Sequence, residues 1–321
     1  MHTDNRPVMV TVHTITFNHE PYLRDCLNGI VMQKTNFRFE AVVHDDCSTD
    51  HTADIIREYA AKYPDIIKPI YETENQYSKG KDSLMGKKMD ALTHGKYIAI
   101  CEGDDYWTDP NKLQMQVDFL EAHPDYGLVH TGSKRYIQKE KVFREGFAAD
   151  TDFNRLLNAN TINTLTVMYR RELFVDYIID IPDRSGWLMG DYPLWLYISH
   201  KSKIEFMPQI TGVYRVLENS ASHPTDFRKN YAFGKSFYEI GELFAKKYGN
   251  AELVHMVINN RINSLNNIAF GFNKGIGWAE FKLICKNRGF SFKQYVITFL
   301  AATTIGVKIV NLIHGIKTYN R

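Results

Sequence analysis

The chain contains few cysteines and no pairing pattern among them. Its 321 residues include four, Cys26, Cys47, Cys101 and Cys285, which lack both CxxC spacing and the density of a secreted disulfide scaffold. This usage argues against zinc and structural disulfides and is typical of a reducing compartment. The first residues, MHTDNRP, are polar and lack the apolar core of a signal peptide, so we expect a cytoplasmic protein.

Long apolar runs and an excess of one charge are also missing. The longest candidate for a membrane span, Tyr295 to Val307, is about 13 residues long, whereas a spanning helix needs roughly 20. The 39 Lys and Arg residues nearly balance the 37 Asp and Glu residues, so the net charge of +2 gives no reason to expect nucleic acid as a partner. With 44% apolar residues, the chain can form one large α/β domain and a smaller appendage.

The first 130 or so residues alternate between two kinds of segment. Short β-branched or aromatic runs are each followed by a polar turn and an amphipathic stretch of about a dozen residues, a pattern typical of βαβ units around a parallel sheet. We expect helices to begin near Pro21, Asp50 and Pro110, the last with Asp109 as its N-cap. Strands are predicted at residues 8–14, 39–44, 66–71, 97–101 and 127–131.

The pattern changes after Asp150. Strands are predicted at residues 164–169, 204–207 and 212–216, with a helix after Asp191, so this segment is expected to extend the sheet and complete a site. Farther along the chain, apolar residues recur at helical spacing. The sequence therefore predicts two domains: a mostly parallel α/β domain over residues 1–225 and a helical region over residues 226–321.

Acidic and polar residues cluster after the predicted strands. Ligands of open parallel sheets collect at the carboxyl ends of the strands. Here these ends carry TFNH at 16–19, HDDCSTD at 44–50 and EGDDYW at 102–107, and no glycine-rich phosphate loop follows the first strand. Asp104 and Asp105 suit a Mn²⁺ or Mg²⁺ ion that bridges carboxylates and a diphosphate. The alternative is that both are ordinary turn residues.

These blocks, in this order, resemble family 2 of the glycosyltransferases, whose fold is called GT-A. The resemblance rests on Thr-Phe-Asn at 16–18, Val-Val-His-Asp-Asp-Cys-Ser-Thr-Asp at 42–50, and Gly-Lys-Tyr-Ile at 95–98 leading to the acidic pair. It implies a GT-A domain that binds a nucleotide-sugar donor together with Mn²⁺ or Mg²⁺.

The resemblance also implies roles for single residues. Thr16 and Asn18 are expected to bind the donor, Asp46 to contact its base, and Asp104 to lie near its ribose. Asp105 is implied as the principal metal ligand.

A second acidic position lies in the motif GDYPLWL at residues 190–196. An acceptor hydroxyl is a weak nucleophile, so direct displacement at an anomeric carbon needs a carboxylate base. Asp191 is our candidate, because inverting members of the resembled family carry an acidic residue just before such a helix. The alternative is that Asp191 simply caps the helix.

Four further residues are candidates for substrate or metal contacts. Arg215 is expected to neutralise donor phosphate, and His223 to reach the metal; the alternatives are a surface ion pair and a solvated loop residue. Trp107 and Trp187 are expected to stack on the acceptor sugar, although a tryptophan at such a position is often part of the core.

The C-terminal segment is basic. After Glu280 the chain has no Asp or Glu but carries seven Lys or Arg residues interleaved with apolar ones. Such a segment either lies on an anionic membrane surface or packs its apolar face on the catalytic domain, with the lysines solvated.

The sequence thus predicts an inverting glycosyltransferase that moves a sugar from a nucleotide diphosphate, with a UDP-sugar favoured. The acceptor is expected to be a glycan or a lipid-linked glycan of the bacterial surface, with no nucleic acid partner, and the enzyme to be cytoplasmic or peripheral on the inner face of the cell membrane. Two alternatives stay open: a sugar nucleotidyltransferase, and an inactive scaffold that binds nucleotide sugars.

Overall fold

The computed structural model describes residues 6–79, 88–218 and 226–314. The chain divides into two compact units that are discontinuous in sequence. Unit 1 comprises residues 1–152, 161–182 and 198–217, and unit 2 comprises residues 153–160, 183–197 and 218–321. The predicted single division at residue 225 stays a prediction, since it falls outside the described residues.

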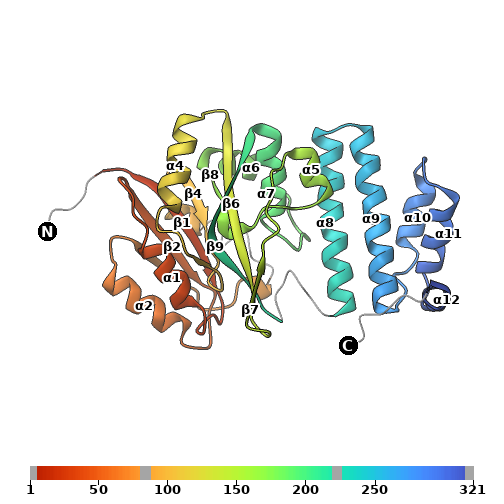
Figure 1. The fold of residues 1–321 in the computed structure, drawn as a ribbon, viewed down its shortest axis with the longest axis horizontal. Coiled ribbons are helices and arrows are strands. Elements are labelled where there is room, and N and C mark those ends of the chain that lie inside the picture. Colours follow the sequence, from red (N-terminus) through yellow and green to blue (C-terminus); the bar gives the residue numbers. More distant parts are fainter. Residues whose placement is uncertain (1–5, 80–87, 219–225, 315–321) are drawn as a thin grey trace. The chain divides into compact units, whose positions relative to one another are not determined.

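Unit 1 contains a mixed β-sheet, seen in Figure 1 as the red, orange, yellow and green arrows. Among the described residues it has nine strands, in the order β3-β2-β1-β4-β8-β6-β9-β5, with β7 paired to β6. The strands are β1 (Val8–Thr16), β2 (Arg38–Asp45), β3 (Ile67–Tyr71), β4 (Tyr97–Ile100), β5 (Tyr106–Trp107), β6 (Tyr126–Ile137), β7 (Val142–Glu145), β8 (Met168–Arg170) and β9 (Lys203–Val216).

The sheet is parallel from β3 to β4, because successive strands there are connected through helices. Strand β8 then pairs antiparallel with both β4 and β6, while β6 and β9 are parallel. The predicted strands of the first half of the chain are confirmed to within a few residues, except that β6 continues to Ile137.

Three strand predictions were wrong in detail. Residues 204–207 and 212–216 form the single strand β9, whose pairing with β6 shifts register between Met207 and Ile210. Proline has no backbone N–H, and Pro208 lies at this irregularity. Residues 164–169 begin as a 3-10 helix, η2 (Thr164–Thr166), and only then enter β8.

Helices α1 (Leu23–Val31), α2 (Thr52–Lys62), α4 (Lys112–Ala122) and α6 (Arg171–Asp180) belong to unit 1, which also contains the 3-10 helix η1 (Tyr77–Lys79). Leu23, Cys26, Leu27 and Ile30 form the buried side of α1 and join the core under the sheet. Asp109 was predicted as the N-cap of α4, but the N-cap is Asn111, two residues later. Asp109 Oδ1 accepts a hydrogen bond from the backbone N–H of Asn111 at 2.8 Å.

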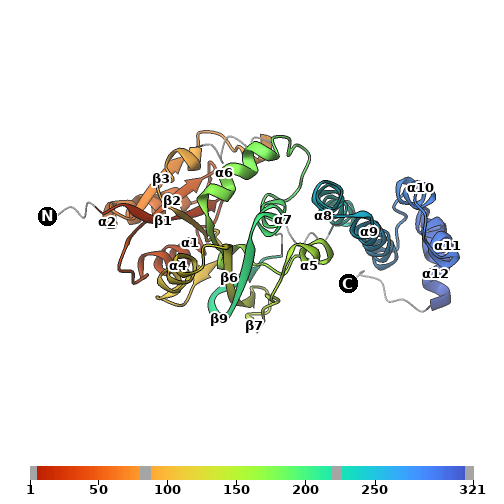
Figure 2. The ribbon, with the colours of Figure 1, turned by 90° about the horizontal axis from the view of Figure 1, so that it is seen from above.

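Unit 2 is helical and includes the region predicted to be helical. It contains α5 (Phe153–Asn158), α8 (Phe227–Tyr248), α9 (Ala251–Phe272), α10 (Ala279–Lys286), α11 (Phe292–Ala301) and α12 (Thr304–His314), while α7 (Tyr192–Lys201) crosses the division. The long helices α8 and α9 lie side by side (Figure 2). Arg261 of α9 is buried and pairs with the buried Glu280 of α10 at 2.8 Å, which links the two helices.

Across the residues with assigned positions, we find no helix both long and apolar enough to cross a membrane.

Candidate active site

The carboxyl ends of β1, β2 and β4 meet at one edge of the sheet, because β1 lies between the other two and parallel to both. Thr16, the last residue of β1, pairs with Asp45, the last residue of β2. Backbone hydrogen bonds continue past the strands: Asp46 N–H donates to Thr16 O and Gly103 N–H donates to Ile15 O, both at 3.0 Å. The polar segments that follow the three strands are therefore brought together, as expected from the parallel sheet.

Asp105 is the most buried carboxylate of this edge, with 1% of its surface exposed. Its Oδ1 accepts a hydrogen bond from the backbone N–H of Arg215 at 2.7 Å, and its Oδ2 has no hydrogen-bond partner among the described residues. Burial raises the pKa of Asp105 well above its usual range, and the nearby Asp104 and Glu102 raise it further. An unsatisfied carboxylate oxygen next to two further carboxylates is a position that a cation would stabilise.

Residues 102–105 are called the acidic loop below. The unsatisfied oxygen of Asp105 fits a divalent cation, but within the described part of the chain the further ligands that a bound ion needs do not surround it. Among the residues that the structure covers, no group of three or more His, Cys, Asp or Glu side chains is arranged to hold a metal ion. Asp104 is half-buried and so is more accessible than Asp105. The two aspartates predicted from the sequence thus differ in environment: one is accessible and the other is deep.

Gly103 lets the acidic loop approach β1 closely. A Cβ atom at this position would lie 2.6 Å from Thr16 Cγ2 and 2.7 Å from His19 Nδ1, distances that real Cβ contacts do not reach. The glycine therefore allows Asp104 to lie beside the residues that follow β1.

The side chain of Arg215 hydrogen-bonds to the backbone of the acidic loop. Its Nε donates to the backbone carbonyl of Asp104 at 2.8 Å, its Nη1 to Gln138 Oε1 at 3.0 Å and its Nη2 to Asp25 Oδ2 at 2.9 Å. Its side chain is 8% exposed, and three aromatic rings surround the guanidinium at 4.9 to 5.7 Å, those of Tyr22, Tyr106 and Tyr136. In this structure the side chain of Arg215 positions the loop, and the phosphate contact expected of it stays a prediction.

The predicted donor residues Asn18 and Asp46 accept hydrogen bonds from neighbouring loops. Both carboxylate oxygens of Asp46 accept backbone N–H groups, from Gln76 at 2.7 Å and Tyr77 at 3.0 Å. Asn18 has a positive φ of 54° and its Oδ1 accepts the backbone N–H of Thr49 at 2.8 Å. These contacts give the loops their shape, while the predicted donor contacts of Thr16, Asn18 and Asp46 stay predictions.

His19 also lies at this edge, and the sequence analysis did not select it. Burial, the largest effect, lowers the pKa of His19, while the charges of Asp104, Asp50 and Asp45 act in the opposite direction. Its Nδ1 is buried and without a hydrogen-bond partner among the described residues. The available signal was its place three residues after the end of β1.

The predicted acceptor residues have different environments. Trp107 is 2% exposed, its indole N–H donates to Leu165 O at 2.7 Å, and its ring lies 4.4 Å from Lys112 Nζ. Trp107 is a core residue in this structure, and its expected acceptor contact stays a prediction. Trp187 is half-buried and belongs to unit 2, where its ring lies 6.4 Å from that of Phe244.

The predicted base lies in unit 2. Asp191 is half-buried, precedes α7 in unit 2, and accepts the backbone N–H of Tyr192 through Oδ1 at 2.8 Å. This contact is compatible both with the helix-capping alternative and with a base that is held in place. His223 lies outside the described residues, so its expected contact with the metal stays a prediction.

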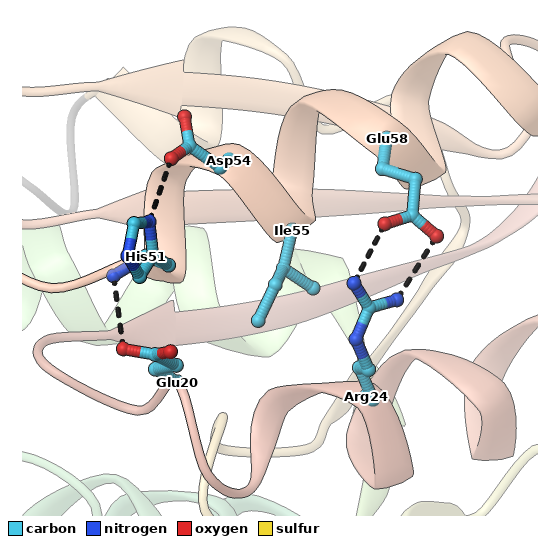
Figure 3. Close-up of a pocket in the computed structure, with 6 residues that line it drawn as sticks. All are labelled: Glu20, Arg24, His51, Asp54, Ile55 and Glu58. Atoms are coloured by element: carbon cyan, nitrogen blue, oxygen red, sulfur yellow. Dashed lines mark hydrogen bonds and ion pairs between the residues drawn. The ribbon is translucent and has the colours of Figure 1, made fainter.

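A separate charged pocket lies between α1 and α2 (Figure 3). Arg24 and Glu58 form a bidentate ion pair across it at 2.9 and 2.7 Å, and His51 Nδ1 lies 3.1 Å from Asp54. None of the predicted donor or metal residues lines this pocket. Of these contacts, the exposed Arg24–Glu58 pair connects α1 to α2.

The family of the chain follows from comparison with known proteins. Residues 11–178, which are 168 of the 321 residues, match the family model "Glycosyl transferase family 2". The chain belongs to this family. This match confirms the resemblance inferred from the strand-end blocks, all of which lie within the matched residues.

Relatives in sequence match this chain over part of their length. The uncharacterized protein Mb1547 of Mycobacterium bovis is 35% identical over 237 residues, which cover 68% of this chain and 63% of that protein. TarS of Staphylococcus aureus, a poly(ribitol-phosphate) beta-N-acetylglucosaminyltransferase, is 25% identical over 268 residues, which cover 82% of this chain and 44% of TarS. This family 2 chain therefore spans less than two thirds of the length of either relative.

Solved structures confirm the GT-A fold with C-terminal helices. Residues 1–349 of TarS with UDP-GlcNAc match with a TM-score of 0.60 at 16% identity, over 98% of this chain and 93% of that one. The mannosyltransferase PcManGT from Pyrobaculum calidifontis, in complex with GDP-Man and Mn²⁺, matches with a TM-score of 0.56 at 18% identity, over 96% of this chain and 88% of that one.

Proposed function

We propose that this family 2 protein is an inverting glycosyltransferase that moves a sugar from a nucleotide diphosphate donor, with a UDP-sugar favoured, to an acceptor hydroxyl in bacterial surface glycan synthesis. The observation that carries the proposal is the acidic loop at the carboxyl ends of β1, β2 and β4, in which Asp105 is buried with an unsatisfied Oδ2 beside Asp104. The donor is supported by solved relatives of the same fold in complex with UDP-GlcNAc and GDP-Man.

Asp105, assisted by Asp104, would hold Mn²⁺ or Mg²⁺, as supported by the Mn²⁺ complex of PcManGT. The bound cation would supply positive charge to the diphosphate as negative charge develops on it. The protein's own part is to keep these carboxylates in place. Arg215 does so by donating its backbone N–H to the Asp105 carboxylate and its Nε to the backbone carbonyl of Asp104. The buried environment of Asp105 strengthens any electrostatic interaction made there.

Asp191 is proposed as the base. Its carboxylate would take the proton of the acceptor hydroxyl as the hydroxyl oxygen attacks the anomeric carbon, and the bond from that carbon to the diphosphate would break on the opposite side. The electron pair leaves with the nucleotide diphosphate, so an α-linked donor gives a β-linked product. The hydrogen bond from the Tyr192 backbone N–H to Asp191 Oδ1 would hold this carboxylate at the start of α7.

The acceptor is proposed to be a glycan or a lipid-linked glycan. TarS is named for transfer to poly(ribitol-phosphate), which supports a surface polymer as the acceptor class. We further propose that the protein works at the cytoplasmic side and that its basic C-terminal segment brings it to the inner face of the membrane.

A donor screen tests the proposal. Purified protein is mixed with UDP-, GDP- and dTDP-sugars, with and without Mn²⁺ or Mg²⁺, and both thermal stabilisation and donor hydrolysis are measured. We expect one nucleotide class to stabilise the protein and to be hydrolysed slowly, only with the cation. Asp105→Asn should lose both responses, while Asp65→Asn, an exposed aspartate on another loop, should keep them.

A second variant separates donor binding from transfer. Asp191→Asn should keep the cation-dependent stabilisation by the donor but lose transfer to an acceptor. Undiminished transfer would rule out Asp191 as the base. Binding of a nucleotide sugar by the native protein with neither hydrolysis nor transfer would favour the inactive scaffold over the enzyme.

A further inference from the structure

Helix α12 exposes a continuous apolar stripe. Ile305, Ile309, Leu312 and Ile313 are 75%, 46%, 86% and 71% exposed, and their spacing of i, i+4, i+7 and i+8 places them on one side of the helix. Single exposed apolar residues are normal on a protein surface, but four large aliphatic side chains within nine residues on one side are not.

The opposite side of α12 is already occupied. Val307 and Val310 are 0% and 7% exposed, and they pack in a cluster with Ala269, Phe270 and Ala301 of α9 and α11. The packing of unit 2 therefore uses one apolar side of α12 and leaves the second uncovered by any described residue. Helix α12 lies in the dark blue C-terminal part of Figure 1.

Helix α11 also exposes apolar side chains along one side. Phe292, Val296 and Phe299 of α11 are 84%, 39% and 49% exposed at spacings i, i+4 and i+7. Phe299 contacts the edge of Trp278, which is itself 44% exposed, with ring centroids 5.3 Å apart. Tryptophan is enriched where a protein meets the polar boundary of a bilayer.

The charge of this region has one sign. From residue 281 to residue 321 the sequence has seven Lys or Arg and no Asp or Glu. Lys308 lies beside Leu312 on the exposed side of α12 and Lys293 follows Phe292, and both are exposed. The last acidic residue, Glu280, is fully buried and paired with Arg261. The exposed charges of α10 to α12 are thus positive throughout.

We propose that the exposed sides of α11 and α12 dock on an anionic lipid bilayer. The aliphatic stripe of α12 enters the boundary between headgroups and acyl chains, and Lys293 and Lys308 contact the anionic headgroups. A second copy of the chain is disfavoured as the occupant, because it would bring two positive surfaces together without any carboxylate between them. The docking does not depend on the proposed transferase activity, which the donor screen tests separately.

Vesicle co-sedimentation tests the docking. Purified full-length protein is mixed with large vesicles of phosphatidylcholine alone, or of equimolar phosphatidylcholine and phosphatidylglycerol. We expect binding to the anionic vesicles, weaker binding to the neutral ones, and loss of binding at high salt. The double variant Ile305→Glu/Leu312→Glu should bind the anionic vesicles at least tenfold more weakly.

The matched control is Ile179→Glu on α6, since Ile179 is 69% exposed but lies in unit 1. It should bind anionic vesicles as the native protein does. Circular dichroism and the melting temperature of the double variant should be unchanged, because both replaced side chains are exposed. Three outcomes would overturn the proposal: no binding of the native protein to anionic vesicles at low salt, unchanged binding by the folded double variant, or an oligomer that the double variant dissociates without any vesicle binding.

Discussion

Replacing His130 with leucine should make the protein more stable in mild acid and flatten the dependence of its unfolding free energy on pH. His130 lies in β6, where its ring is fully buried 5.0 Å from the ring of Phe206. Neither ring nitrogen has a hydrogen-bond partner among the described residues. Burial lowers the pKa of His130 from 6.5 to about 4.

The sign and size of the effect follow from this pKa. Between pH 6.5 and 4 the unfolded state binds a proton at His130 that the folded state does not, so stability present above pH 6.5 is lost as the pH falls. A pKa difference of about 2.5 units corresponds to about 3 kcal/mol. His13, whose pKa burial also lowers to about 4, contributes in the same direction, so the variant should remove only part of the loss. At neutral pH the leucine also removes two buried polar atoms without partners, so stability there should not fall.

Urea unfolding followed by circular dichroism, at several pH values from about 4 to 7.5, measures this difference. The native protein should lose stability more steeply than His130→Leu as the pH falls below 6.5. As a control, His51→Gln changes an exposed histidine whose pKa is raised by its hydrogen bond to Asp54, so any effect should have the opposite sign. Parallel profiles for the native protein and His130→Leu would refute the reasoning.

Three further substitutions test the packing around the site. Gly29→Ala places a Cβ 2.8 Å from the backbone N and O of Trp107, and should lower the free energy of unfolding by about 1–3 kcal/mol in urea titrations. Arg215→Met removes the side-chain hydrogen bonds to Asp104, Asp25 and Gln138; it should cost about 3 kcal/mol and weaken cation-dependent donor binding, measured by calorimetry. Tyr192→Phe removes a 3.0 Å hydrogen bond to Leu156 O and should lower stability by about 1 kcal/mol, with unchanged donor binding as its check.

Local patterns were enough to predict the parallel half of the sheet. Strands β1 to β4 are short buried runs between polar turns, and helices alternate with them along the chain as in βαβ units. The spacing of apolar residues therefore identifies them from the sequence. The antiparallel part was less accessible. Strand β9 passes Pro208 as one strand because its pairing with β6 continues on both sides, and such a long-range pairing has no local signature.

For the candidate site too, local features were predictable from the sequence and long-range contacts were not. The acidic loop was predicted because Asp104 and Asp105 directly follow a strand. The contact between Asp105 and the backbone of Arg215 joins residues 110 positions apart, so no spacing in the sequence indicates it. Trp107 was predicted to bind an acceptor because it is aromatic and close to this loop, but the neighbours that bury it, Leu165 and Lys112, come from elsewhere in the sheet and helices.

The hydrogen bond that holds Asp105 is donated by the main chain of residue 215, so it does not depend on which side chain stands at that position. Any residue other than proline offers the same N–H at this place in β9, so exchanges at position 215 alter the aromatic surroundings but leave the carboxylate anchored. This one anchor of Asp105 therefore survives most substitutions at position 215, whereas the hydrogen bonds of the Arg215 side chain to Asp104, Gln138 and Asp25 do not. Position 105 has no such tolerance, because only a side chain of the length of aspartate, with an oxygen at its end, reaches the N–H of residue 215.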